Sequence, residues 1–148
     1  MSEEPSVDVV MSTPPILVGT TISVAEGARI MARENVGSLI IVDENDSLIG
    51  IVTKTDIVYK VVAEGRNPST TMLGEIMTRN PYYIFRDASL REAAELMGDK
   101  RIGHLPVVDP ETMKVVGVIS KSDILRIAPH YIELVYVTGM ARREPREE

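Results

Sequence analysis

The chain has 148 residues, of which 44% are hydrophobic and 26% charged, values that are normal for a globular domain. It has no cysteine, which excludes disulfides, thiolate metal sites and thiol nucleophiles. The net charge of −6 disfavours nucleic-acid partners, which need a basic surface, although local donors can still hold a small anion. No apolar run reaches the roughly 18 residues of a membrane helix, and the N-terminus is acidic rather than basic. We therefore expect a cytoplasmic protein with no membrane partner.

The first expected elements, in chain order, are a strand at residues 16–18 and a helix capped by Ser23. Glu26 follows this serine at the spacing of a capping box. Gly37 lies just past the helix, where a left-handed turn is expected. Two β-branched runs, residues 39–42 and 48–52, are joined by polar residues and predict a hairpin. A second helix is expected to open directly after the hairpin, at a threonine that is a good N-cap.

The same order, β-α-β-β-α, then appears a second time. Met11 and Met77 begin matching stretches 66 residues apart, and Gly103 is the counterpart of Gly37. After one extra residue in a turn, the offset becomes 67, and residues 50–57 (GIVTKTDI) match residues 117–124 (GVISKSDI). Matches in one order and register indicate a duplication. We predict a single module with a first repeat at 8–65, a connector at 66–74, a second repeat at 75–128, and an extension with a charged tail at 129–148.

One repeat of about sixty residues would bury its sheet poorly. We therefore expect an α/β (α+β) fold in which two repeats pack sheet to sheet with pseudo-two-fold symmetry. Beyond the second repeat, Pro129 ends a helix, and residues 131–137 are apolar almost throughout. The β-branched content of this stretch favours a strand, whereas a proline at a first-turn position favours a helix. Both assignments stay open.

The start of the second helix in each repeat combines two kinds of polar group. Its backbone amides and its hydroxyl, from Thr53 or Ser120, favour an anion such as phosphate. The carboxylate three residues later, Asp56 or Asp123, lies on the same face and can accept from both hydroxyls of a ribose. The alternative is helix capping alone, because this spacing is also that of a capping box. The recurrence of the pattern in both repeats favours binding.

Three features together resemble the CBS (cystathionine-β-synthase-like) motif. They are an opening hydrophobic-Met-(Ser/Thr)-x-x-Pro, a glycine before the hairpin, and Gly followed by two hydrophobic residues and (Ser/Thr)-x-x-Asp. The resemblance covers residues 8–128 and implies a CBS pair with two ligand clefts between its repeats, a homodimer, and a regulated partner protein. In such pairs the aspartate holds the ribose, the helix-start hydroxyl approaches the phosphates, and the first strand frames the adenine.

Carried over to this sequence, the resemblance assigns a set of residues to each cleft. The first cleft would hold Thr53, Asp56, Pro15, Ile16 and Val18. The second would hold Ser120, Asp123, Tyr82, Tyr83 and Ile84, with His104, Arg101 and Lys121 near the phosphates. Each has a plainer alternative: Tyr83 can be a core or interface tyrosine, His104 a hydrogen-bonded strand residue, and Lys121 a solvated lysine. The second repeat alone carries the histidine, so the clefts are expected to differ.

The resulting hypothesis is a regulatory module that senses AMP, ADP or ATP and transmits occupancy to a partner. S-adenosylmethionine is the competing ligand, although its sulfonium would not need His104 or Arg101. A scaffold or nucleic-acid-linked regulator with degenerate clefts is a third possibility. We see no nucleophile–base–orienter set, so we expect no enzyme activity, no catalytic or metal site and no required cofactor. Which adenosine ligand binds, and whether one or both clefts are filled, is left open.

Overall fold

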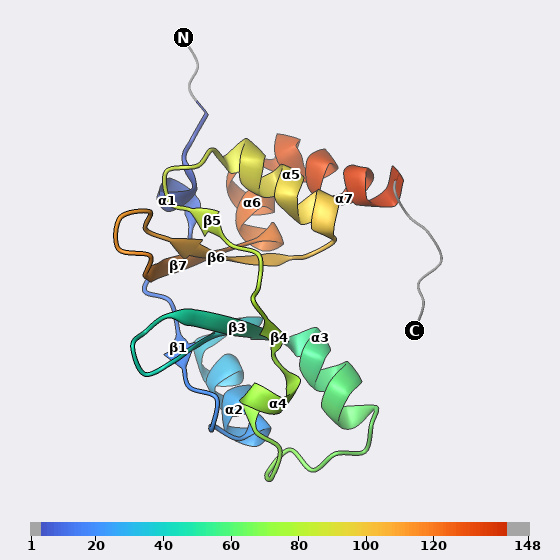
Figure 1. The fold of residues 1–148 in the computed structure, drawn as a ribbon. Helices are drawn as coiled ribbons and strands as arrows, with labels where there is room; N and C mark the ends of the chain where they lie inside the picture. The colour runs from blue at the N-terminus through green and yellow to red at the C-terminus, as the bar shows by residue number, and fades with distance from the viewer. Residues whose placement is uncertain (1–3, 142–148) are drawn as a thin grey trace. The chain divides into compact units, whose positions relative to one another are not determined.

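The computed structural model describes residues 4–141, and side chains as far as residue 136, in two compact units (Figure 1). The central unit comprises residues 15–81. Among the described residues, the terminal unit comprises 4–14 together with 82–141. The predicted tail from residue 142 lies outside the described residues. The protein is a mixed α/β fold with two small sheets, as the sequence predicts.

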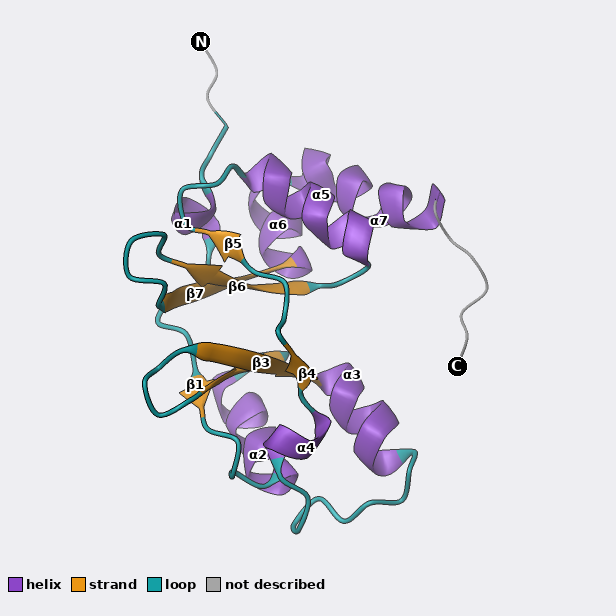
Figure 2. Ribbon diagram, viewed as in Figure 1, coloured by secondary structure: helices purple, strands orange, loops and turns teal. Residues whose placement is uncertain are grey.

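The central unit is built on a four-stranded sheet in the order β1-β2-β3-β4 (Figure 2). Its strands are β1 (Leu17–Val18), β2 (Ser38–Val42), β3 (Leu48–Thr53) and β4 (Thr78–Arg79). Strand β1 runs parallel to β2, and the other pairs are antiparallel. Its helices are α2 (Val24–Glu34), α3 (Lys54–Ile57), a π-helical turn at Val58–Val62, and α4 (Leu73–Ile76).

The terminal unit is built on a three-stranded sheet in the order β5-β6-β7. Its strands are β5 (Ile84–Phe85), β6 (His104–Val108) and β7 (Val115–Ser120), and β5 runs parallel to β6. Its helices are α1 (Val7–Val10), α5 (Leu90–Lys100), α6 (Lys121–Ile127), the 3-10 turn Pro129–Tyr131 and α7 (Ile132–Ala141). The predicted β-α-β-β-α order is therefore confirmed in both repeats.

The N-terminal end of α2 agrees with the sequence prediction, whereas the C-terminal ends of α2 and α5 differ from it. Ser23 caps α2 by accepting from the backbone NH of Glu26 at 3.1 Å, as expected. The left-handed residues that end α2 and α5 are Asn35 (φ 56°) and Arg101 (φ 58°), so the expected left-handed turns at the two later glycines are wrong. Both helices end before they reach those glycines. The absence of a side chain at Gly103 instead leaves room for the side chain of Lys121, because a Cβ at Gly103 would lie 3.1 Å from Cε of that lysine.

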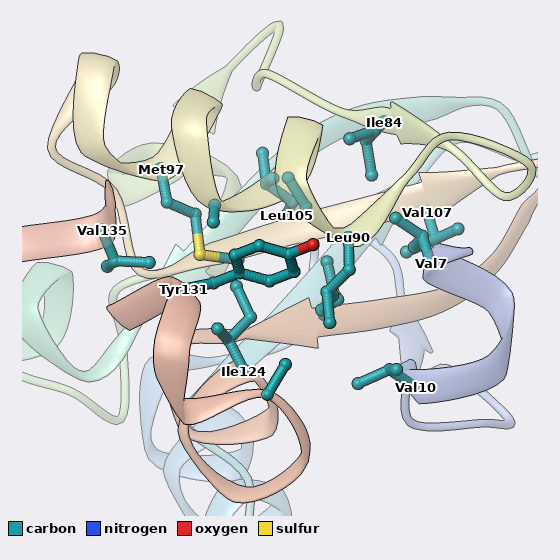
Figure 3. Packing of buried hydrophobic residues seen from close by; sticks show 14 residues of the cluster. Val7, Val10, Ile84, Leu90, Met97, Leu105, Val107, Ile124, Tyr131 and Val135 are labelled. Carbon is teal, nitrogen blue, oxygen red and sulfur yellow. The ribbon is translucent and has the colours of Figure 1, made fainter. Parts of the chain in front are cut away.

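Each repeat contributes its opening segment to the unit that holds the other repeat. Helix α1 opens the first repeat in sequence, yet Val7 and Val10 lie in the core of the terminal unit, where Figure 3 shows them near Leu90. The backbone of Ser12 pairs with Val118 of β7 through two hydrogen bonds of 2.8 and 3.1 Å. Helix α4 opens the second repeat and is buried in the central unit in the same way.

The ambiguous apolar stretch after the second repeat is helical. Pro129 begins a 3-10 turn that leads directly into α7, which packs on α5. Tyr131 is buried, and its hydroxyl donates to Glu4 at 2.6 Å. This hydrogen bond to a carboxylate raises the pKa of Tyr131 above its ordinary value. Within residues 4–141, no helix is long and apolar enough to cross a membrane.

Candidate ligand-binding sites

The helix start in the central unit is a complete capping box. Thr53 is the last residue of β3, and its backbone NH and hydroxyl donate to Oδ2 of Asp56 at 2.8 and 3.2 Å. The hydroxyl in turn accepts from the backbone NH of Asp56 at 3.3 Å. Asp56 is only 9% exposed, so its carboxylate is held tightly at the start of α3.

The terminal unit repeats this geometry almost atom for atom. The backbone NH and hydroxyl of Ser120 donate to Oδ2 of Asp123 at 2.9 and 3.0 Å, and the hydroxyl accepts from the backbone NH of Asp123 at 3.3 Å. Asp123 is 5% exposed. The capping that the sequence offered as the alternative to binding is therefore present in both repeats. It uses only Oδ2, so it does not by itself exclude a ligand.

The second carboxylate oxygen, Oδ1, faces a cation in both units. Nζ of Lys60 lies 3.0 Å from Oδ1 of Asp56, and Nη2 of Arg126 lies 3.0 Å from Oδ1 of Asp123. A carboxylate oxygen has lone pairs for two donors. Each Oδ1 can therefore accept a ligand hydroxyl beside the cation. Sequence reasoning missed both cations, although their spacing of four and three residues from the aspartate is a recognisable helical signal.

The register of the central sheet brings the first strand to the same edge as the helix start. Leu17 lies opposite Ile40, and Thr53 lies opposite Ser38. The carbonyl of Ile16 accepts from Ile40 NH at 3.2 Å, which places Pro15 level with Ser38. With one strand between them, Pro15 and Thr53 are separated by about 10 Å, a span that a nucleoside can bridge.

Two of the predicted base-framing residues lie in hydrophobic cores. Val18 and Ile84 belong to the cores of the central and terminal units, and this packing accounts for their apolar character without a ligand. Tyr82 and Tyr83 are exposed beside the start of β5. Tyr83 packs edge-on against Phe85 with ring centroids 5.6 Å apart, and Nζ of Lys100 lies 5.2 Å from the Tyr82 ring centroid. These two tyrosines offer ring surface at the edge of the sheet.

Two of the predicted phosphate residues, His104 and Lys121, lie at the start of α6. His104 is the direct ladder partner of Ser120, so the register brings these two together. Lys121 is the first residue of α6, and its backbone NH donates to the Gly103 carbonyl at 3.0 Å. Its Nζ lies 4.7 Å from the ring centroid of Tyr136 on α7, a contact that the repeat pattern gave no means of finding.

Arg101 occupies the left-handed position that ends α5, three residues before His104. Its backbone is therefore in the left-handed conformation, and its place in the chain keeps it near the start of β6. Among the residues that the structure describes, no group of three or more His, Asp or Glu side chains is arranged to hold a metal ion.

Two α/β repeats, each with a carboxylate fixed at an equivalent helix start, define a tandem-repeat α/β protein. The family model for the CBS domain matches residues 7–63 and again residues 73–130. These matches cover most of the chain, which therefore belongs to the CBS domain family as a tandem pair.

Similar proteins carry the same pair in different settings. An uncharacterized protein of Methanopyrus kandleri is 35% identical over 86% of this chain, which spans 62% of that protein. L-aspartate semialdehyde sulfurtransferase of Methanocaldococcus jannaschii is 36% identical over 80% of this chain, which spans 22% of that enzyme. The CBS domain pair of protein MJ0100, solved with 5′-methylthioadenosine and S-adenosyl-L-methionine, is 34% identical with a TM-score of 0.78, covering 86% of this chain and 98% of that one. The chain thus spans less than two thirds of the Methanopyrus kandleri protein and of the sulfurtransferase.

Proposed function

We propose that this CBS pair senses an adenosine-containing ligand, with Asp56 and Asp123 as acceptors for ribose hydroxyls. The observation that carries the proposal is the second carboxylate oxygen, which both repeats hold at a helix start with capacity for one more donor. The structure of the MJ0100 pair with two adenosine-containing ligands supports the ligand class. Binding would act on a regulated partner protein through different affinities for two states of the module.

We further propose that the terminal-unit site takes the phosphate-bearing ligands AMP, ADP or ATP. His104 lies opposite Ser120, whereas the equivalent residue opposite Thr53 is Ser38. A histidine beside the helix-start amides favours an anion, and Arg101 and Lys121 add positive charge nearby. S-adenosylmethionine or 5′-methylthioadenosine is the second candidate ligand, and it fits the central-unit site better because that site lacks this histidine.

The ribose assignment is tested by isothermal titration calorimetry with AMP, ATP and S-adenosylmethionine. Asp56→Asn and Asp123→Asn each keep one acceptor oxygen for the cap but remove the charge. We expect each to weaken binding at its own site roughly 10- to 100-fold, since a hydrogen bond to a charged group contributes about 1.5–3 kcal/mol. Ser89→Ala is the control: it removes the cap of α5, which accepts from Glu92 NH at 3.1 Å, and should leave affinity unchanged. Unchanged affinity in both aspartate variants would refute the assignment.

We also propose that the chain forms a homodimer through its second helices. Val58, Tyr59 and Val62, on the π-helical turn that follows α3, are at least half exposed, and so are Leu125 and Ile127 of α6. Exposed apolar side chains grouped on one element are typical of an interaction surface. Size-exclusion chromatography with light scattering should give a dimer mass for the wild type and a monomer mass for Val62→Glu. Val9→Glu, at another exposed valine, should remain dimeric; a monomeric wild type would contradict the proposal.

A further inference from the structure

Lys60 makes two hydrogen-bonding contacts at once. Its Nζ lies 3.0 Å from Oδ1 of Asp56 and 2.9 Å from the backbone carbonyl of Ile76. Asp56 is the candidate ribose acceptor, and Ile76 is the last residue of α4. The ammonium group of Lys60 therefore joins the carboxylate of Asp56, the candidate ribose acceptor, to helix α4, which lies further along the chain.

The local backbone around Lys60 is unusual. Ala63 NH donates to the carbonyl of Val58, and Arg66 NH donates to that of Val61, each at 2.9 Å. These bonds span five residues, so the chain widens into a π-helical turn that begins two residues after the aspartate. Single π-helical turns occur frequently at functional sites, because they redirect side chains that a regular α-helix would place elsewhere.

The second repeat does not carry this connection at the same position. The residue aligned with Lys60 is Ile127, which has no charge, and the cation on Asp123 comes instead from Arg126. Duplication alone would have given both repeats the same arrangement. The double contact of Lys60 is thus a feature of the first repeat, and it requires its own explanation.

The helix that Lys60 contacts leads out of the central unit. Residue Met77 follows α4 directly, its side chain packs against Gly50, and strand β4 then pairs with β3 through Gly50 and Ile51. The chain leaves the central unit after Pro81. Helix α4 and strand β4 are therefore the last elements before the chain enters the terminal unit. A shift of the carboxyl end of α4 would move this exit segment.

We propose that Lys60 is a positioning residue that couples ligand binding on Asp56 to α4 and β4. The proposal rests on the assignment of Asp56 as a ligand acceptor. A hydroxyl that donates to Oδ1 shares this oxygen with the ammonium and weakens the Lys60–Asp56 contact. The ammonium then interacts more strongly with the Ile76 carbonyl, which stabilises the end of α4 and the adjoining β4. The Arg126–Asp123 pair has no such effect on residues 73–80.

Hydrogen–deuterium exchange of residues 73–80 tests this coupling, with saturating AMP and 5′-methylthioadenosine as the probes. In the wild type we expect ligand to slow exchange in this segment several-fold. Lys60→Met, once saturated with ligand, should show no slowing, whereas Lys60→Arg should restore it. Arg126→Met is the matched control, because it removes the equivalent cation in the other repeat and should leave the response of residues 73–80 intact.

The possible outcomes distinguish a wrong ligand site at Asp56 from a wrong coupling through Lys60. If ligand binds, Asp56→Asn abolishes the response and saturated Lys60→Met still shows full slowing, then the coupling through Lys60 is wrong while the ligand site stands. If neither probe binds the wild type, the ligand site itself is wrong, and the coupling falls with it. Exchange in β2 and β3 reports whether each variant is folded, because these strands form the interior of the central sheet.

Discussion

At the scale of single residues, Arg101 adopts a left-handed backbone conformation, which Met113 (φ 59°) shares. It holds φ 58° at the end of α5, a region that ordinary L-residues avoid at a cost of about 1–2 kcal/mol. The equivalent residue in the first repeat is Asn35, which tolerates this conformation. We propose that Arg101 is kept in this position because its charge serves the candidate phosphate site, three residues before His104.

We therefore expect Arg101→Asn to raise the free energy of unfolding by up to about 1 kcal/mol, by relief of backbone strain. The same change should weaken AMP binding, because it removes a positive charge that we propose to serve the ligand phosphates. Urea unfolding and calorimetry measure the two effects separately. The reverse exchange, Asn35→Arg, should destabilise the protein without affecting the terminal-unit site. A stabilised variant with unchanged AMP affinity would remove Arg101 from the ligand site.

Sequence reasoning reached part of the candidate site at this scale. The Thr53–Asp56 pair and its counterpart were predictable because their contacts depend on a spacing of three residues. Lys60 was within reach by the same argument, but its second contact with Ile76 depends on a π-helical turn that no spacing rule indicates. The left-handed conformation of Arg101 was not predictable, because arginine carries no preference for it.

At the scale of elements, the short helices α1 and α4 were absent from the predicted layout. In the sequence, both helices lie at the opening of a repeat. No sequence pattern indicates on which of the two similar sheets each helix packs. The structure shows why both fit where they lie. Gly50 and Gly117, at equivalent positions, leave space for Met77 and Met11, so each methionine seats its segment on a strand of the other repeat.

This seating predicts the effect of a small substitution at Gly117. A Cβ there would lie 2.5 Å from Sδ of Met11 and 3.0 Å from the backbone carbonyl of Ser12. The methionine can move, but the carbonyl belongs to the pairing with Val118. Gly117→Ala should therefore lower the free energy of unfolding by about 1–3 kcal/mol, the usual cost of overpacking. Gly19→Ala, where a Cβ meets nothing within 4 Å, is the matched control in thermal unfolding. Equal stability of the two variants would contradict the proposed seating.

At the scale of the whole molecule, the sequence repeats and the compact units do not coincide. A repeat read from the sequence would have α1 stabilise the strands that follow it. The structure places α1 with β5, β6 and β7, so the terminal unit is built from both ends of the chain. Mutations near the N-terminus should therefore act on the second repeat.

Val7 and Val9 offer a direct test of this exchange. Val7 is fully buried in the core of the terminal unit, whereas Val9, on the same short helix, is 75% exposed. Val7→Ala should cost about 2 kcal/mol through lost burial and a residual cavity, and Val9→Ala should change stability by less than about 0.5 kcal/mol. Hydrogen–deuterium exchange locates the loss: we expect it in β6 and β7, with β2 and β3 unaffected. Faster exchange in β2 and β3 instead would mean that α1 stabilises its own repeat.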